Sequence, residues 1–187
     1  MIAFEKMRVS ARLMVAGVAV LAGLALLAVN TVIQTRNHAL EAHNVRLKDL
    51  IESTIGVVKY YQKQEIDKKL SREEAQLQAK EALRPLRFGN DDYFFLYDFE
   101  GRAVMVAGNP KIEGQVLLGK TDTKGFKLWD AIVEVGKGPG KGYIDYWFPR
   151  AGQQEAKPKR AYLMAVPEWQ WVVGTGAMTW TKQSKKR

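Results

Sequence analysis

Hydrophobic and polar positions form three successive patterns along this chain, and the first is a long apolar run. Every residue from 13 to 29 is apolar or glycine, and only Asn30 and Thr31 interrupt the run before it ends at residue 33. At 1.5 Å per residue, a helix over residues 13–33 reaches across a hydrocarbon core about 30 Å thick. The pattern therefore predicts a membrane-spanning helix.

A cleaved signal peptide is the alternative, because the apolar run follows the basic residues Lys6, Arg8 and Arg12. The run exceeds the usual ~7 to 15 apolar residues of a signal peptide, and no small-x-small cleavage site appears near residues 27–31. We therefore favour an uncleaved anchor. Long domains are translocated largely regardless of their charge, so residues 1–12 are expected in the cytoplasm and the rest outside it.

The second pattern has helical periodicity. Apolar residues recur mostly three, four or seven positions apart at Leu40, Leu47, Ile51, Ile55, Val58 and Ile66. No Gly or Pro lies between Gly23 and Ile55, so the spanning helix is expected to continue into this long helix. Ser71 and Glu74 form a capping box that starts a second helix, which is expected to bend or fray at Pro85 and to end at residues 89–90. Its apolar stripe comprises Ala75, Ala79, Ala82, Leu83 and Leu86.

The third pattern begins after Asp92 and consists of short β-branched or aromatic runs divided by turn residues. Five strands are predicted, at residues 93–97, 102–106, 142–148, 159–166 and 169–174, with a loop at 109–120 and a short helix at 125–135. Consecutive strands joined by short turns imply an antiparallel sheet. The fold class is therefore α+β, with one domain over residues 34–178 and a basic tail at 179–187.

Alternation along the strands separates two apolar faces. Tyr93, Phe95 and Tyr97 point to one side of the sheet, whereas Phe94 and Leu96 point to the other. In the third strand, one side carries Ile144, Tyr146 and Phe148. We expect one face to pack on the long helix, and the other face either to line a ligand cavity under the 109–120 loop and the short helix or simply to fill the core.

Two basic residues adjoin this aromatic surface. Arg87 precedes the first strand and Lys159 opens the fourth, and either could hold a carboxylate, with Arg able to do so through two hydrogen bonds. The alternative is a solvated surface charge, since the chain has 29 Lys and Arg residues.

Composition argues against most catalytic chemistry. The chain has no cysteine, which excludes thiol nucleophiles, disulfides and zinc-thiolate sites. Its two histidines, His38 and His43, are five apart and do not share one helical face, and no pair of catalytic carboxylates stands out. We expect no enzyme, no metal and no cofactor. The net charge of +9 attracts anions in general without selecting one, and no nucleic-acid partner is expected.

One segment matches the residues of a known motif but lacks the secondary structure that the motif requires around it. Residues 114–121 fit the phosphate-binding pattern G-x-x-x-x-G-K-T, which requires a strand directly before it and a helix directly after the lysine, here Lys120. The preceding residues 109–113 have the composition of a loop, and Gly125 follows closely. An NTPase is therefore rejected.

Two groups of motifs occur in a fixed order. The first group comprises Tyr93-Phe94-Phe95-Leu96-Tyr97-Asp98, Gly101, Asn109-Pro110 and Glu113-Gly114. The second comprises Gly142, Tyr146, Phe148-Pro149, Pro158-Lys159, Tyr162 and Trp169-Gln170-Trp171-Val172-Val173-Gly174-Thr175-Gly176. Together they resemble the single Cache (sCache) sensor domains of bacterial methyl-accepting chemotaxis receptors and sensor kinases, over residues 34–178.

The resemblance implies a PAS-like five-stranded antiparallel sheet, a dimer formed through the long helices and a pocket for a small metabolite, often a short carboxylate. By position, it implies ligand contacts from Arg87, Tyr93, Phe95, Tyr97, Tyr146, Phe148 and Lys159. Ala107 and Gly108 stand where the family often has a histidine, and Met164 stands where a lysine is common. The family's usual acids are therefore not assumed for this chain.

The leading hypothesis is a single-pass protein of the bacterial inner membrane whose periplasmic domain senses a small organic anion. The alternative is an accessory partner of a full-length chemoreceptor with no ligand of its own. Only residues 179–187 follow the expected domain, so a signal would pass through the N-terminal helix or a partner, unless the chain is a receptor fragment.

Overall fold

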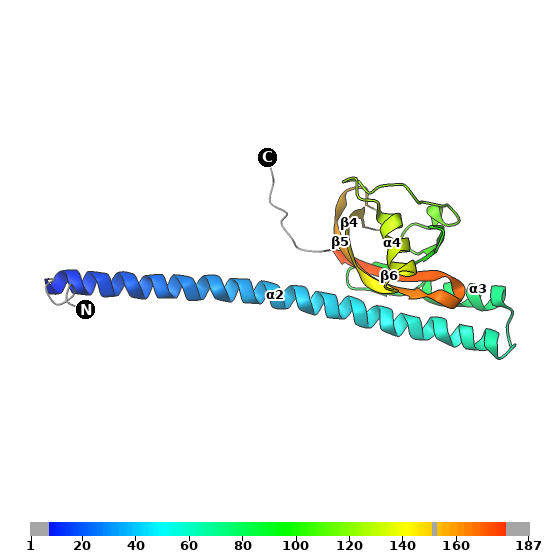
Figure 1. The fold of residues 1–187 in the computed structure, drawn as a ribbon, viewed down its shortest axis with the longest axis horizontal. Coiled ribbons are helices and arrows are strands. Elements are labelled where there is room, and N and C mark those ends of the chain that lie inside the picture. Colours follow the sequence, from blue (N-terminus) through cyan, green and yellow to red (C-terminus); the bar gives the residue numbers. More distant parts are fainter. Residues whose placement is uncertain (1–7, 151–152, 179–187) are drawn as a thin grey trace. The chain divides into compact units, whose positions relative to one another are not determined.

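The structure is a computed structural model that describes residues 8–150 and 153–178. The chain divides into two units, residues 1–44 and 45–187 (Figure 1). The expected basic tail at 179–187 and the first seven residues lie outside the described residues.

The helix α2 (Val9–Ile66) begins in the first unit and is unbroken, as the sequence predicted. Its residues 13–33 expose their large apolar side chains, and this helix is long and apolar enough to cross a membrane. Two hydroxyls within or next to the apolar run are satisfied by the helix itself. Thr31 Oγ1 donates to the Leu27 carbonyl at 2.9 Å, and Thr35 Oγ1 donates to the Thr31 carbonyl at 2.8 Å. This pairing suits a helix surrounded by lipid, where an unpaired polar group is costly.

In the second unit, α3 (Arg72–Leu83) begins at the predicted capping box. The Glu74 N–H donates to Ser71 Oγ at 3.2 Å, and the Ser71 N–H donates to Glu74 Oε2 at 2.8 Å. The hydrogen bonds to Ser71 lower the pKa of Glu74, most through its backbone N–H. The helix ends earlier than predicted, at Leu83, because Pro85 has no N–H with which to continue it.

The sheet has six antiparallel strands rather than the five predicted. They are β1 (Arg87–Phe88), β2 (Asp92–Asp98), β3 (Ala103–Val106), β4 (Lys141–Pro149), β5 (Ala156–Val166) and β6 (Trp171–Met178). Their order is β1-β2-β6-β5-β4, and β3 also pairs with β2. The extra strand, β1, has two residues, too few for an alternating pattern to reveal.

Three short helical segments complete the described fold: η1 (Pro110–Ile112), α4 (Leu128–Lys137) and η2 (Pro167–Trp169). The predicted 125–135 helix therefore starts three residues late, and η2 occupies the start of the last predicted strand. Gln170 follows η2 in the left-handed region, with φ +54°, and β6 begins directly afterwards.

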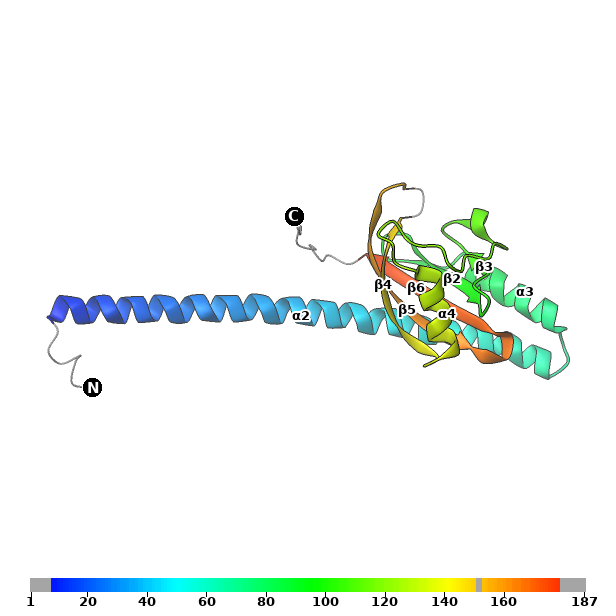
Figure 2. The same ribbon diagram turned by 45° about the horizontal axis from the view of Figure 1, so that its top comes forward.

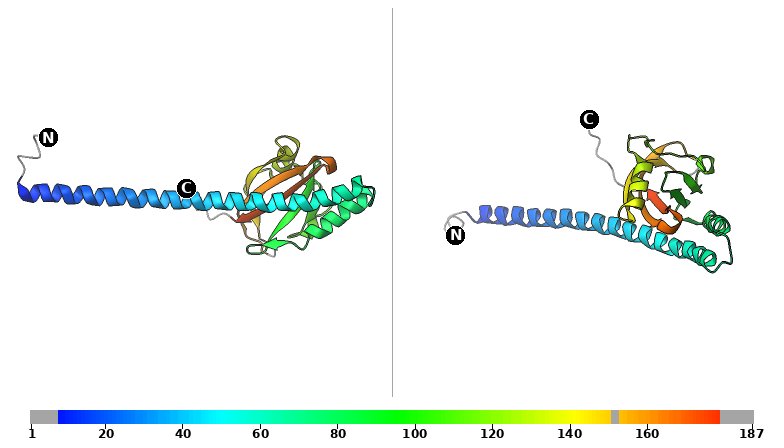
Figure 3. Two further views of the ribbon diagram at one scale, coloured as in Figure 1. Left: turned by 90° about the horizontal axis from the view of Figure 1, so that it is seen from below. Right: turned by 45° about the vertical axis from the view of Figure 1, so that its right-hand side comes forward.

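Each face of the sheet has its own core, as the alternation predicted. Phe94 and Leu96 pack with Ile51 of α2 and Leu83 of α3. Figure 3 shows α3 and the C-terminal part of α2 side by side on this face. The opposite face contacts α4, which lies across the strands in Figure 2. The last members of both predicted apolar stripes are exposed, Ile66 of α2 at 77% and Leu86, beyond the end of α3, at 39%.

Candidate ligand-binding site

Six of the seven candidate residues lie on the face of the sheet that α4 covers. They come from three strands: Tyr93, Phe95 and Tyr97 from β2, Tyr146 and Phe148 from β4, and Lys159 from β5. Tyr146 and Lys159 are direct cross-strand partners. Five of the six are buried and Phe148 is partly buried. The sheet therefore gathers an aromatic surface around one ammonium group.

Glycines under this surface make room for the rings. A Cβ on Gly174 would lie 2.1 Å from Phe95 Cε2, and a Cβ on Gly176 would lie 2.9 Å from the Tyr146 hydroxyl. Both glycines belong to β6, between the strands that supply the rings. Two rings from β2 and β4 consequently approach the β6 backbone more closely than any side chain there would permit.

Gly108 has the same role for Tyr93. A Cβ at this position would lie 2.0 Å from Tyr93 Cε1, so the Tyr93 ring occupies the space that a side chain at residue 108 would need. This position is one of the two at which the chain departs from the histidine common in the family it resembles. The Tyr93 ring can therefore occupy its position only because residue 108 is a glycine.

Gly108→Ala is expected to displace the Tyr93 ring and to destabilise the fold by about 1 to 3 kcal/mol, the usual cost of overpacking. Gly142→Ala is the matched control, because its Cβ would meet only Val135 methyl groups at 3.7 Å, an ordinary contact. Thermal denaturation of both variants measures the difference. Equal melting temperatures for the two variants would contradict this account of residue 108.

Lys159 is the buried cation of the site. Its side chain is only 3% exposed, and its Nζ lies 3.8 Å from Asp92 Oδ1 and 5.0 Å from the centre of the Tyr93 ring. Burial lowers the pKa of Lys159, and the Asp92 carboxylate opposes this effect. The ammonium is thus paired with the Asp92 carboxylate and lies beside the aromatic face of Tyr93.

The tyrosines of the site supply neutral donors. Burial raises the pKa of Tyr93 to about 12, and it also raises the pKa of Tyr97 and of Tyr146. Their hydroxyls therefore remain protonated at neutral pH, when each can donate a hydrogen bond to an oxygen of a ligand.

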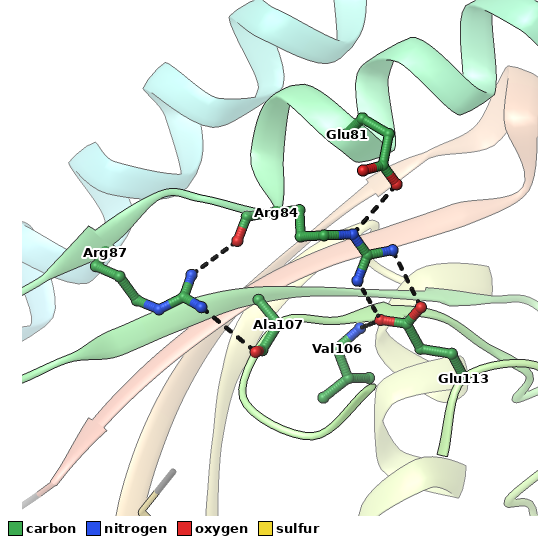
Figure 4. A network of polar contacts seen from close by, with 6 residues as sticks. All are labelled: Glu81, Arg84, Arg87, Val106, Ala107 and Glu113. Atoms are coloured by element: carbon green, nitrogen blue, oxygen red, sulfur yellow. Dashed lines mark hydrogen bonds and ion pairs between the residues drawn. The ribbon is translucent and has the colours of Figure 1, made fainter. Parts of the chain in front are cut away.

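Arg87 lies at the edge of this surface, in a different environment (Figure 4). Its Nη1 donates to the carbonyls of Arg84 and Leu86, both at 2.8 Å, and its Nε lies 3.4 Å from Asp91 Oδ1. The side chain is 36% exposed. Its positive charge nevertheless opposes the rise in the pKa of Tyr93, its cross-strand partner. Arg87 is thus close to the site, and its guanidinium already has partners.

A second arginine fixes the segment that covers the aromatic face. Arg84 donates to both carboxylate oxygens of Glu113, at 2.8 and 3.1 Å, and Glu113 also accepts the Val106 N–H at 2.8 Å (Figure 4). Leu117, four residues further along, is buried in the aromatic cluster. The Arg84–Glu113 pair therefore joins the end of α3 to the loop over the site.

The rejected phosphate-binding motif belongs to the same loop. The Gly119 N–H, which a phosphate would need, donates to Asp130 Oδ2 at 2.8 Å. Lys120 is followed by a loop, and α4 begins only at Leu128. Among the described residues, no group of three or more His, Asp or Glu side chains could hold a metal ion. The loop around Lys120 therefore lacks the free backbone N–H group and the following helix that a phosphate-binding motif requires.

Comparison with known protein families identifies the family to which this domain belongs. Residues 40–180 match the family described as Single Cache domain 2. The chain belongs to this family. The sheet with its aromatic face and covering loop is thus a Cache sensor domain, and the fold implied by the sequence motifs is confirmed.

Relatives of this Cache domain include chemotaxis proteins. It is 31% identical to the methyl-accepting chemotaxis protein McpP of Pseudomonas putida over 92% of this chain, which spans 32% of McpP. A solved structure titled as the periplasmic sensor domain of a chemotaxis protein is 33% identical, with a TM-score of 0.73 over 75% of this chain and 97% of its own. Another solved structure is a Cache chemosensory domain described as recognising carboxylic acids. It is 29% identical, with a TM-score of 0.74, and the match covers 76% of this chain and 97% of that domain.

Sequence reasoning missed two polar residues of this Cache domain. Asp92 is 8% exposed and lies beside Lys159. In the sequence it follows Asp91 directly before an apolar strand, a pattern that is typical of a turn. Glu113 is 29 residues away from its partner Arg84, and no local pattern links them. The resemblance to Cache domains included Glu113 among the family's motifs, but it assigned no role to this residue.

Proposed function

We propose that residues 34–178 form a periplasmic sensor domain that binds a small organic anion without catalysing a reaction. The observation that carries this proposal is Lys159, an ammonium group buried among aromatic rings on the covered face of the sheet. Its ammonium has three N–H donors, so beside Asp92 it can also donate to a ligand carboxylate, and the rings contact the remainder of the ligand. The carboxylic acids named for one solved relative support this ligand class.

We further propose that residues 13–33 anchor this domain in the bacterial inner membrane, with residues 1–12 in the cytoplasm. The exposed apolar surface of this part of α2 supports an anchor, and the periplasmic description of a solved relative supports the orientation. The domain would signal as a homodimer through α2 or by pairing with a chemoreceptor. A shift of the helices on binding would suffice for either route.

Thermal denaturation of a soluble fragment of residues 34–187 tests the binding proposal. A ligand at 100 times its Kd stabilises the native state by about 2.7 kcal/mol, which raises the melting temperature by several degrees. Acetate, propionate, pyruvate, lactate, malonate and succinate form the panel, and sodium chloride of equal ionic strength is the control. A melting temperature unchanged by every acid would favour the accessory role without a ligand.

A further inference from the structure

The aromatic surface has one end that solvent reaches. Along β4, Ile144 and Tyr146 are 8% and 7% exposed, whereas Phe148 and Arg150 are only partly buried. These four residues occupy alternate positions, and the first three pack in the aromatic cluster. Arg150 directly follows the last residue of β4 and continues that alternation. The strand therefore places Arg150 at the accessible end of the proposed binding surface.

Arg150 also lies near the buried ammonium of Lys159. Burial lowers the pKa of Lys159, the Asp92 carboxylate opposes this effect, and the positive charge of Arg150 lowers that pKa further. Two cations that influence each other in this way repel. Two positive charges thus share one buried carboxylate, and the three groups have a net charge of +1. A bound anion would balance this excess charge.

Arg150 differs from the neighbouring arginines because it has no acidic partner. Carboxylate oxygens lie between 2.7 and 3.8 Å from the guanidinium nitrogens of Arg72, Arg84, Arg87, Arg102 and Arg160. Within residues 8–150 and 153–178, by contrast, no salt bridge or side-chain hydrogen bond involves Arg150. Its guanidinium therefore keeps its N–H donors for a ligand.

We propose that Arg150 is a second ligand-binding cation, and that the carboxylate of the ligand is held between its guanidinium and the ammonium of Lys159. This inference rests on the proposed binding of an organic anion. A guanidinium presents parallel N–H donors to both oxygens of a carboxylate, and the ammonium has three donors to divide between Asp92 and the ligand. The anion also places a negative charge between two positive charges that otherwise repel.

Arg150→Gln tests this assignment in the full chain solubilised in detergent. Calorimetric titration with acetate, propionate, pyruvate, lactate, malonate and succinate identifies the acids that the native protein binds. Arg150→Gln should bind each of those acids at least about tenfold more weakly, the usual loss for a hydrogen bond between charged groups. Arg150→Lys keeps the charge without the parallel donors, so its affinity should lie between those of the native protein and Arg150→Gln.

The stability of the ligand-free protein separates a binding role from a structural one. Replacing a residue that holds the fold together lowers the melting temperature. Removing the Arg150 charge instead relieves its repulsion with Lys159, so the melting temperature of ligand-free Arg150→Gln should equal or exceed that of the native protein. For the same reason, NMR titration of the lysine Nζ groups should show a higher pKa for Lys159 in this variant.

Arg160→Gln is the matched control for the loss of charge. Arg160 follows Lys159 in the chain, but its guanidinium pairs with Asp145 at 2.7 Å and lies beside the Tyr143 ring. That ring contacts Tyr162, which belongs to the core on the opposite face of the sheet. The control thus removes the same charge from the other face, and it should bind the acids as the native protein does.

Each contrary result overturns a specific statement. Native affinity in Arg150→Gln, or equal weakening in Arg160→Gln, would overturn the role of Arg150 and leave anion binding intact. So would an unchanged pKa of Lys159, since the two cations would then be too far apart to share one carboxylate. A lower melting temperature of ligand-free Arg150→Gln would replace the binding role with a structural one. No binding of any acid by the native protein would overturn the proposed function itself.

Discussion

Lys159→Met is expected to weaken the binding of every carboxylate ligand by at least about 30-fold. Truncating one member of a buried charge pair costs about 2 to 5 kcal/mol, and each 1.4 kcal/mol is tenfold in affinity. The loss should be similar for all acids, because the ammonium contacts the group they share. Methionine keeps the length and apolar stem of the lysine, so the aromatic packing remains filled.

Calorimetric titration of the native protein and the variant measures this loss. Lys157→Met is the matched control, because Lys157 belongs to the same strand but has an exposed side chain, 3.4 Å from Glu155. The control should bind ligand as the native protein does. If Lys159→Met still binds ligand, then the buried ammonium does not contact the ligand, and the main evidence for anion recognition is lost.

The same lysine predicts a pH dependence of stability. Burial lowers the pKa of Lys159 below its ordinary value of 10.5. Between the two pKa values, the unfolded chain binds more protons than the native state, so stability rises as pH increases through that window. Anion affinity falls over the same window because Lys159 loses its charge. Both effects should disappear in Lys159→Met.

Much of the fold follows from local patterns in the sequence. The capping box at Ser71 fixes the start of α3, and alternation from Tyr93 to Tyr97 assigns those side chains to the correct faces of the sheet. Both signals depend on residues a few positions apart, which is the range over which propensity and periodicity operate. Differences from the prediction occur where a helix ends, as at Leu86, where the predicted apolar stripe continues but α3 has already ended at Leu83.

The polar features of the site depend instead on residues far apart in the chain. Trp129 belongs to an apolar helical face in the sequence, and only the folded arrangement places its buried indole beside the Tyr97 hydroxyl. One partner of Arg87 was hidden for the same reason, because the Ala107 carbonyl that accepts from its guanidinium is 20 residues away in the chain. The residues that gather at a site can thus be named from patterns, whereas their charge and hydrogen-bond states need the tertiary structure.

Glu113→Ala is expected to lower the free energy of unfolding by about 2 to 3 kcal/mol. The variant leaves the Val106 N–H buried without its acceptor and removes the two charge-assisted hydrogen bonds from Arg84. Glu113→Gln keeps an oxygen for the Val106 N–H and should cost only about 1 kcal/mol. Denaturant unfolding of the two variants separates the role of the acceptor from the role of the charge.

Glu81→Ala is the control for the surrounding charges. Glu81 also accepts from Arg84, at 3.2 Å, but its side chain is 53% exposed, so its loss should cost less than about 0.5 kcal/mol. A cost for Glu81→Ala equal to that of Glu113→Ala would indicate a general effect of charge near Arg84.

The Glu113 interactions also predict how stability changes in acid. Burial alone would raise the pKa of Glu113, but the hydrogen bonds from Arg84 and the Val106 N–H outweigh it and lower the pKa below the ordinary value of 4.5. The carboxylate therefore stabilises the fold fully above that value, and this contribution is lost as pH falls through the lowered pKa. The difference in unfolding free energy between the native protein and Glu113→Gln should consequently narrow in acid. Because the loop that Glu113 holds covers the aromatic face, Glu113→Ala should also speed ligand release, which stopped-flow displacement measures.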